Sequence, residues 1–143
     1  AGRNAAETLE REQVRWLADQ GKTERALSEL AEALGRMLDD LQAHLGVLVT
    51  HSMAAMGGAP TEIYKTGLHT TALLESMSEV VISWLLLRHA EIAAAKIDEE
   101  PFYAGKVASA RFFIADVAPK VSARRAAAES EDGSLMELPL EAF

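Results

Sequence analysis

The chain has 143 residues, of which 49% are hydrophobic and 25% are charged, and its formal net charge at pH 7 is −8. A single domain of this length buries a sizeable hydrophobic core, and the absence of cysteine excludes disulfides and thiolate metal sites. The negative charge argues against binding to nucleic acid and to anionic membrane surfaces, because both attract basic proteins.

The location of the protein is predicted from what its sequence lacks. Residues 1–12 are polar and have no apolar stretch of the kind that a secretory signal needs. The longest apolar run, residues 80–87, is far shorter than the roughly 20 residues that span a bilayer. We therefore expect a cytoplasmic protein with no membrane partner. Because the chain starts without methionine, we expect either a processed chain or a piece of a longer one.

The first helix is expected at residues 5–20. Its apolar positions are sparse and its charges dense, so it should be peripheral, with Trp16 and Leu17 as its docking contacts. Gly21 follows it, and glycine commonly occupies the position just after a helix C-terminus. We therefore assign residues 1–22 to a peripheral N-terminal helix.

A second, core-facing helix is expected to begin at Thr23, a good N-cap residue, and to run to about Met56. Two rows of residues repeat every seven positions along it, which is typical of a helix in a bundle. The first row is Leu27, Leu34, Leu41 and Leu48; the second begins with Leu30 and Met37 and continues with His44 and His51; Leu38 and Leu45 widen the stripe.

The third helix should follow the break at residues 57–60, with Pro60 or Thr61 at its start, and run to about Ile97. Residues 80–87 have no clearly polar face, so this part should lie at the bundle centre or under an additional surface. The long apolar side of the helix is expected to consist of Ile63, Leu68, Leu74, Met77, Val81, Trp84, Leu85 and Ile92.

The fourth helix is expected to begin near Phe102, after a turn at residues 98–101. Pro119 should bend or interrupt it, and residues 120–128 should continue it to a polar break. The tail, residues 134–143, is too apolar for a frayed end, so we expect it to pack on the bundle or on a neighbour. The apolar stripe of the helix is Tyr103, Val107, Ala110, Ile114, Val117 and Val121.

Together these elements predict an all-α fold: an antiparallel, up-down four-helix bundle with a short extra N-terminal helix and an extended C-terminal tail. The bundle is assigned to residues 23–129 and the tail to residues 130–143. Because the third helix and the tail are unusually apolar, we expect self-association into a homo-oligomer.

Motifs for catalysis and metal binding are missing from the sequence. No glutamate has a histidine three residues later, as a di-iron bundle requires. His44 and His51 lie about two helical turns apart, which is too far for them to share one ion. There is no Gly-x-Ser-x-Gly elbow and no glycine-rich phosphate loop. We therefore expect no metal site and no catalytic residue in this chain.

Two weaker binding signals remain open. Lys106 and Arg111 could bind an anion, although a solvated or salt-bridged helix face is the commoner role of such residues. Tyr64, Trp84 and Tyr103 could stack on a flat ligand, although core packing is the usual fate of aromatic side chains. Neither signal identifies a ligand.

The sequence FYAGKVASARFFIADVAP, residues 102–119, resembles the C-terminal helical module of a subgroup of bacterial acyl-CoA dehydrogenases. The tail SLMELPLEAF, residues 134–143, resembles the C-terminal ending of the same subgroup, which is similar to 3-methylmercaptopropionyl-CoA dehydrogenase. The matching positions of the helix are Phe102, Tyr103, Lys106, Ala110, Arg111, Phe112, Phe113, Val117 and Pro119.

The resemblance implies a parent enzyme that binds FAD and oxidises acyl-CoA thioesters to 2,3-enoyl-CoA. In that family the FAD site and the catalytic carboxylate lie upstream of this module, so no catalytic or cofactor-binding residue is carried over to this chain. The chain is then expected to be an accessory domain that packs against the catalytic domains and binds no cofactor itself. The alternative is a stand-alone helical module that binds a ligand or a partner. A small helical enzyme is disfavoured by the missing motifs.

Overall fold

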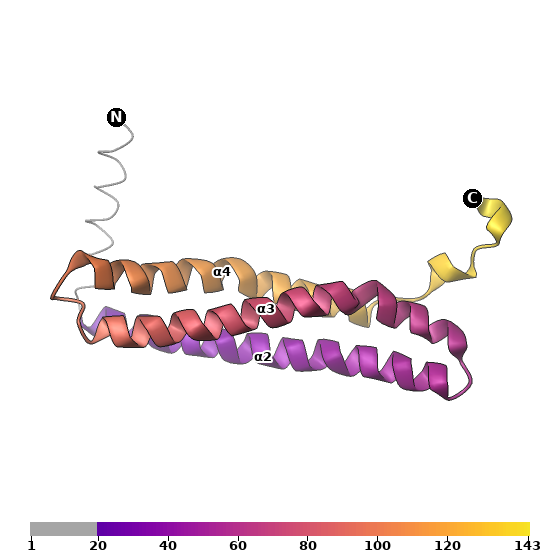
Figure 1. Cartoon of the computed structure of the whole chain (residues 1–143), viewed down its shortest axis with the longest axis horizontal. Helices are drawn as coiled ribbons and strands as arrows, with labels where there is room; N and C mark the ends of the chain where they lie inside the picture. Colours follow the sequence, from indigo (N-terminus) through magenta and orange to yellow (C-terminus); the bar gives the residue numbers. More distant parts are fainter. Residues whose placement is uncertain (1–19) are drawn as a thin grey trace. The chain divides into compact units, whose positions relative to one another are not determined.

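The computed structural model describes residues 20–143, and every regular element in this part of the chain is helical (Figure 1). The long helices are α2 (Gln20–Met56), α3 (Ile63–Ala94) and α4 (Pro101–Glu129), and the short 3-10 turns are η1 (Pro60–Glu62), η2 (Ser134–Glu137) and η3 (Leu140–Ala142). The predicted all-α class is confirmed. The described residues hold three long helices, so they do not confirm a bundle of four. The helix predicted at residues 5–20, with Trp16 and Leu17, lies outside the described residues except for its last residue.

Two predictions about the start of α2 are wrong. Gly21 lies inside the helix and does not follow one, and Thr23 is buried within the helix and does not cap it. Thr23 begins the seven-residue row that continues with Leu30 and Met37, so burial in the core outweighs its preference for a cap. Glycine inside a helix costs about 1 kcal/mol relative to alanine, which a helix of 37 residues tolerates.

The chain divides into two compact units, and each unit takes a segment from all three helices. Unit 1 contains residues 20–36 together with Val80–Ala118, and unit 2 contains Met37–Glu79 together with Pro119–Phe143. Short connections join successive helices, at residues 95–100 in unit 1 and at residues 57–59 in unit 2. Such connections make successive helical segments antiparallel within each unit (Figure 1).

The core of unit 1 follows the predicted stripe of α4. Val107, Ala110, Ile114 and Val117 are almost completely buried, whereas Tyr103 is only half-buried at the edge of the stripe. This part of the prediction is confirmed. The other buried apolar residues of the unit are Ala26, Leu30, Leu34, Val80, Leu87, Ala90, Ala93, Ile97 and Ala104.

The core of unit 2 joins its three helices through Leu48 of α2, Leu73 of α3 and Ala128 of α4. Leu41 and Val47 pack against these residues, and Met37, His44 and Val121 are also buried. The two predicted rows of α2 are confirmed as its buried side, but the predicted widening of the stripe is wrong. Leu38 and Leu45 are exposed.

Helix α4 begins at Pro101 and continues through Pro119 to Glu129. Proline suits the first helical position because the N–H that it lacks would have no partner within the helix at that position. Because the helix runs unbroken past Pro119, the predicted interruption there is not observed. The predicted continuation to the polar residues near 129 is confirmed. The helix tolerates the lost hydrogen bond because residues on both sides of the proline, Val117 and Val121, are buried in the core.

Candidate functional site

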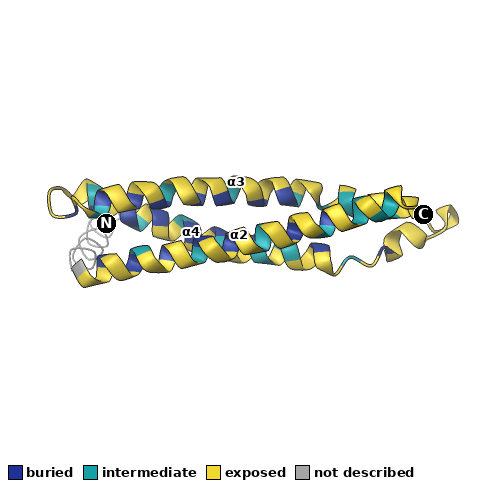
Figure 2. Ribbon diagram, turned by 90° about the horizontal axis from the view of Figure 1, so that it is seen from below, coloured by how far each residue is buried: buried dark blue, intermediate teal, exposed yellow. Residues whose placement is uncertain are grey.

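The α3 segment of unit 1 exposes large apolar side chains to solvent. Val81, Trp84 and Leu85 are 54%, 52% and 44% exposed, and they share one side of the helix because they are three or four residues apart. We call these three residues the outer face of α3. Figure 2 shows exposed residues along the length of this helix. In unit 2 the same helix exposes Ile63, Tyr64, Leu68, Leu74 and Met77.

This exposure overturns the predicted apolar side of the third helix. All eight residues expected to face the core are between 44% and 62% exposed. The helix is apolar on nearly every side, so the periodicity of its sequence does not distinguish the buried side. The side that faces the core carries many small residues, which leave room for the larger side chains of α2 and α4. It consists of Leu73, Ser76, Val80, Ser83, Leu87, Ala90 and Ala93.

A hollow of ≈ 250 Å³ lies between α3 and the start of α4, and three of the residues that carry the family resemblance line it. The rings of Phe102 and Tyr103 meet edge to face, with their centroids 5.6 Å apart. The Lys106 ammonium lies 5.1 Å from the centroid of Phe102, so this lysine stacks on an aromatic ring. The hollow is lined by His89, Ile92, Ala93, Phe102, Tyr103 and Lys106.

A second hollow, of ≈ 460 Å³, follows further along the same two helices in unit 1. Leu86 of α3 lines one side, and Ala108, Ser109, Phe112 and Phe113 of α4 line the other. Phe112 is 78% exposed, whereas Phe113 is half-buried. We call the two hollows together the α3–α4 groove. No carboxylate lines either of them.

Among the other candidate residues, Tyr64, Trp84, Arg111 and Pro119 line neither hollow. Arg111 and Pro119 lie on exposed positions of α4, and Lys106 contacts the Phe102 ring. Of the three residues considered for stacking, Tyr103 is half-buried, and Tyr64 and Trp84 are exposed. Core packing is therefore not the role of Tyr64 or Trp84 in this structure.

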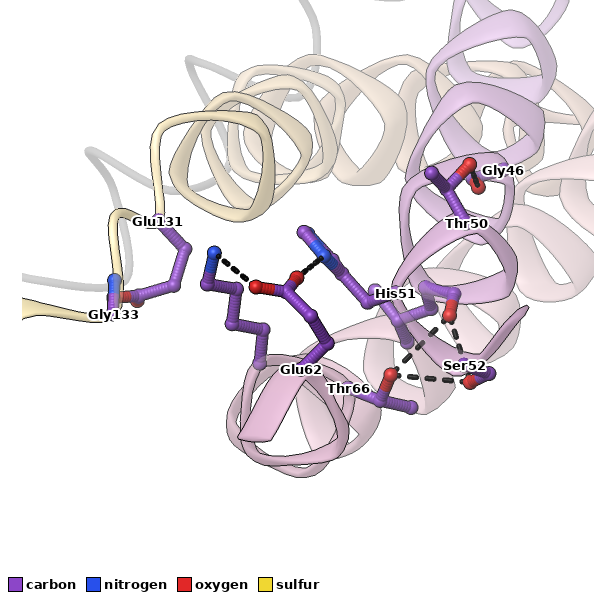
Figure 3. A network of polar contacts seen from close by, with 10 residues as sticks. Gly46, Thr50, His51, Ser52, Glu62, Thr66, Glu131 and Gly133 are labelled. Carbon is purple, nitrogen blue, oxygen red and sulfur yellow. Dashed lines mark hydrogen bonds and ion pairs between the residues drawn. The ribbon is translucent and has the colours of Figure 1, made fainter. Parts of the chain in front are cut away.

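Polar contacts connect α2, η1 and α3 in unit 2. His51 Nδ1 lies 2.6 Å from the Glu62 carboxylate, as Figure 3 shows, and Lys65 lies 3.0 Å from the same carboxylate. Lys65 first, and His51 second, lower the pKa of Glu62. The Thr66 hydroxyl donates to the Leu48 carbonyl at 3.2 Å. These contacts hold the α2–α3 connection in place.

His44 lies at the centre of unit 2 and is 1% exposed. Neither of its ring nitrogens has a hydrogen-bond partner among the described residues. Burial is the main cause that lowers the pKa of His44, and the neighbouring His69 lowers it further. His69 itself lies 3.2 Å from the Glu131 carboxylate. A neutral His44 is therefore the form that suits this core.

Arg124 makes the strongest ion-pair cluster of unit 2. Its guanidinium donates to Glu79 at 2.6 Å and 3.3 Å, and lies 3.2 Å from Glu75 and 3.4 Å from the Ser76 hydroxyl. The hydrogen bond with Glu79 is the main cause that raises the pKa of Arg124. This arrangement joins α4 to α3 with a bidentate contact.

Sequence reasoning missed Arg124, His69 and His89. Arg124 continues the spacing of the α4 stripe, because it lies seven residues after Val117, so its position on the inner side could have been found. His69 lies seven residues before the buried Ser76 on the inner side of α3. The sequence did not single out His89, because the prediction placed the wrong side of α3 towards the core.

The described residues do not fit a metal ion or a flavin dinucleotide. No three His, Asp or Glu side chains in the described part come together as a metal site would need. His44 approaches His69 and not His51. The two hollows of the α3–α4 groove, of ≈ 250 Å³ and ≈ 460 Å³, offer few hydrogen-bonding groups for a flavin dinucleotide.

Pro60–Ala94 is long and apolar enough to cross a membrane, judged by length and composition alone. Its most apolar window has a mean hydropathy of 1.3 and is 28% buried. The helix also carries an exposed ion pair, between Arg88 and Glu91 at 2.8 Å, and charged side chains are costly in lipid. Its inner side, with Ser76 and Ser83, packs within the units.

Comparisons with known proteins give a consistent result. Residues 5–139 match the family model described as "Acetyl-CoA dehydrogenase C-terminal like". The chain is 38% identical over 128 residues to "Broad-specificity linear acyl-CoA dehydrogenase FadE5" of Mycobacterium tuberculosis, a match that covers 85% of this chain and 20% of that protein. It is 35% identical over 83 residues to "Butyryl-CoA dehydrogenase" of Syntrophomonas wolfei, which covers 53% of this chain and 14% of that protein. The chain thus spans a fifth or less of the length of these curated relatives.

Proposed function

The chain belongs to the family of acetyl-CoA dehydrogenase C-terminal-like domains, and from this premise we propose that it is an accessory domain of a FAD-dependent acyl-CoA dehydrogenase. The parent enzyme would oxidise acyl-CoA thioesters to 2,3-enoyl-CoA, with FAD accepting the electrons. The observation that carries the proposal is the match over residues 5–139 by a chain that spans only 20% of a dehydrogenase relative. Catalytic residues and flavin-binding residues would then belong to the other parts of the parent protein.

The role proposed for this domain is packing and assembly. The outer face of α3 supports it, because three large apolar side chains on one helix side favour a covering surface. The proposed cover is the catalytic part of the same parent chain. Contact with a lipid surface is disfavoured by the exposed Arg88–Glu91 pair and by the net charge of −8.

Several finer points belong to the same proposal. The acyl-CoA would bind to the parent enzyme, and the protein would be a cytoplasmic homo-oligomer that binds neither nucleic acid nor membranes. Membership of the subgroup similar to 3-methylmercaptopropionyl-CoA dehydrogenase stays a prediction. So does the four-helix bundle with a short extra N-terminal helix.

The accessory role is tested on the purified 143-residue chain. Its absorbance spectrum reports bound flavin, and an acyl-CoA oxidation assay with an artificial electron acceptor reports turnover. We expect neither signal from this chain, and both from the parent enzyme. Stoichiometric FAD together with acyl-CoA turnover by the chain alone would contradict the accessory role.

The docking role of the outer face is tested in the intact parent enzyme. Leu85→Lys places a charge on the outer face, and Gln42→Lys places the same charge on an exposed position of α2. Leu85→Lys should speed the release of the domain by limited proteolysis, because a lysine in an apolar contact must lose water without a partner. Gln42→Lys should behave as wild type.

The same two variants in the isolated chain supply the control for folding. Both positions are exposed there, so both variants should unfold within about 0.5 kcal/mol of wild type. Proteolysis of the parent that is equally slow for Leu85→Lys and Gln42→Lys would show that the outer face is not a docking surface.

A stand-alone binding module is the second candidate. The α3–α4 groove favours it, because the groove combines aromatic walls with a lysine and a histidine. The reading frame distinguishes the two candidates. If no dehydrogenase fold is encoded with these residues, the accessory role fails and the binding module becomes the better proposal.

A further inference from the structure

The α3–α4 groove of unit 1 is apolar with a basic character. Its titratable lining residues are His89, Lys106 and Tyr103, and no carboxylate lines it. Lys96 lies beside the groove, with its ammonium 5.7 Å from the Tyr103 ring. In a chain with a net charge of −8, a groove lined by a lysine and no carboxylate suits an acidic partner.

The C-terminal tail, residues 134–143, has the opposite character. It contains Glu137 and Glu141 and no basic residue, and the chain has no lysine or arginine after Arg125. Neither η2 nor η3 contains a buried residue. The large apolar side chains of the tail are all exposed, from Met136 at 40% to Leu140 at 88%: Leu135, Met136, Leu138, Leu140 and Phe143.

The backbone of the tail is ordered by local contacts in unit 2. Gly133 adopts φ 76°, which lets the chain turn before η2. The Ser134 N–H donates to Asp132 at 2.9 Å, and the Gly133 N–H points to Glu131 at 3.4 Å. Leu138 and Pro139 are extended between the two 3-10 turns. A partly ordered segment loses less conformational entropy when it binds.

We propose that the tail of one chain docks in the α3–α4 groove of a second copy of this chain. Leucine, methionine and phenylalanine side chains of the tail would cover the aromatic walls of the groove, and its glutamates would face Lys106 and His89. Apolar contact would supply the affinity, and the opposite charges would set the orientation. This proposal rests on the geometry and charges of the tail and the groove, and not on the parent enzyme.

A second copy is the partner that the chemistry favours. Each chain carries one tail and one groove, so two copies that exchange tails about a twofold axis would satisfy both grooves. Both surfaces expose large apolar side chains, and both are apolar enough to favour being covered. Exchange of two tails also doubles the buried surface relative to a single contact.

The first experiment measures the oligomeric state of the 143-residue chain by sedimentation velocity over a range of concentrations up to about 100 µM, where even a micromolar dimer is populated. We expect a dimer that dissociates on dilution. A variant that ends at Gly133 should remain monomeric at every concentration, and its circular dichroism should still show folded helices, because η2 and η3 bury nothing.

Charge reversal tests the proposed contact itself. Lys106→Glu in the groove should weaken the dimer by at least about tenfold, since like charges would then meet. Arg36→Glu, the same change on an exposed position of α2, is the matched control and should leave dimerisation unchanged. A tail variant with both Glu137→Lys and Glu141→Lys should also weaken the dimer, whereas Glu29→Lys should not.

Mixing the two weakened variants distinguishes exchange between copies from other arrangements. In an equimolar mixture, the lysines of one tail meet the glutamate of the other groove, so hetero-dimers should form although neither variant dimerises well alone. Three outcomes overturn the proposal: a wild-type chain that stays monomeric, a dimer that survives deletion of the tail, and a mixture that associates no better than its components.

Discussion

The imidazole rings of His44 and His69 meet edge to face in unit 2, with their centroids 6.4 Å apart and their planes at 72°. His69 has the Glu131 carboxylate as a partner, whereas His44 has no hydrogen bond among the described residues. Burial, His69 and Arg124 lower the pKa of His44, while the His69 backbone and Glu129 act in the opposite direction. Of the two rings, His44 is therefore the one that its surroundings keep from being protonated.

The first prediction concerns the dependence of stability on pH. The folded state holds the pKa of His44 below the ordinary value of 6.5, so the unfolded chain binds this proton more readily. Stability should be complete above the unfolded pKa and should fall as the pH falls from 6.5 towards the lower folded value. Urea unfolding at pH 7.5, 6.5 and 5.5 measures the effect.

Two carboxylates with lowered pKa values, Glu62 and Asp132, do not obscure the effect of His44 between pH 5.5 and 7.5. The pKa of Glu62 is lowered from 4.5 by Lys65 and His51, and that of Asp132 is lowered from 3.8 by the Ser134 backbone N–H. Their stabilising contributions are present above those values and are lost only at more acidic pH. A chain that is equally stable at pH 7.5 and 5.5 would contradict the prediction for His44.

The second prediction is that His44→Leu stabilises the protein at pH 7.5. The substitution removes two buried ring nitrogens that lack partners, and each unpaired buried polar group costs about 1–3 kcal/mol. We expect the free energy of unfolding to rise by about 1–2 kcal/mol, and the loss of stability between pH 6.5 and 5.5 to shrink. His89→Leu, made in the chain that ends at Gly133, is the matched control, because His89 is exposed and no tail can cover it there; it should leave the stability unchanged.

The third prediction concerns Arg124. Arg124→Met removes the partner of Glu79, whose side chain is only 19% exposed, and leaves that carboxylate poorly solvated and unpaired. The free energy of unfolding should fall by about 1–3 kcal/mol. Arg88→Met removes an exposed pair with Glu91 and should change the stability by less than about 0.5 kcal/mol. Equal effects of the two variants would show that the Glu79 contact contributes nothing beyond a surface pair.

The α4 stripe and the α3 stripe show what sequence alone can and cannot predict here. The α4 stripe is correct because Val107, Ile114 and Val121 lie on one side of the helix at seven-residue spacing, although the exposed Phe112 shows that large apolar residues are not confined to that side. On α3 the small residues Ser83 and Ala90 face the core while Leu85 faces outward, so residue hydrophobicity indicates the wrong side. Which side is buried depends on the volumes supplied by α2 and α4, and the sequence of α3 does not contain that information.

The candidate site was predictable only in part, for a related reason. Phe102, Tyr103 and Lys106 are singled out by the sequence and do line one hollow. The opposite wall comes from His89 and Ile92, ten or more residues away in sequence. Their pairing with the aromatic residues depends on the register of α3 against α4 and on the turn that joins them, and a sequence pattern does not fix that register.

The fourth prediction compares two neighbouring residues of α4. Ile114 is 1% exposed and Phe112 is 78% exposed, although both are large and apolar. Ile114→Ala should lower the free energy of unfolding by about 2–5 kcal/mol, because it leaves a cavity in the core of unit 1. In the chain that ends at Gly133, which has no tail to cover the groove, Phe112→Ala should change it by less than about 0.5 kcal/mol. A comparable loss from both variants in urea unfolding of that chain would mean that Phe112 is covered within the folded domain.

The fifth prediction compares two glycines. Gly133 adopts φ 76°, and a Cβ added there would lie 3.1 Å from Lys65 Cε. Gly35 lies inside α2, and nothing is within 4 Å of its added Cβ. Gly133→Ala should lower the free energy of unfolding by about 1 kcal/mol, because alanine disfavours positive φ. Gly35→Ala should raise it by about 0.5–1 kcal/mol, because alanine loses less backbone entropy in a helix.

Gly133→Ala also has a consequence beyond stability, because the glycine directs the chain into η2. The Lys65 side chain must move to admit the methyl group, and its contact with Glu62, now 3.0 Å, should loosen. Since Lys65 is the main cause that lowers the pKa of Glu62, that pKa should rise towards its ordinary value. NMR titration of the glutamate side chains measures the change. A Gly133→Ala chain in which the Glu62 pKa stays as low as in wild type would show that Lys65 accommodates the methyl group without giving up its ion pair.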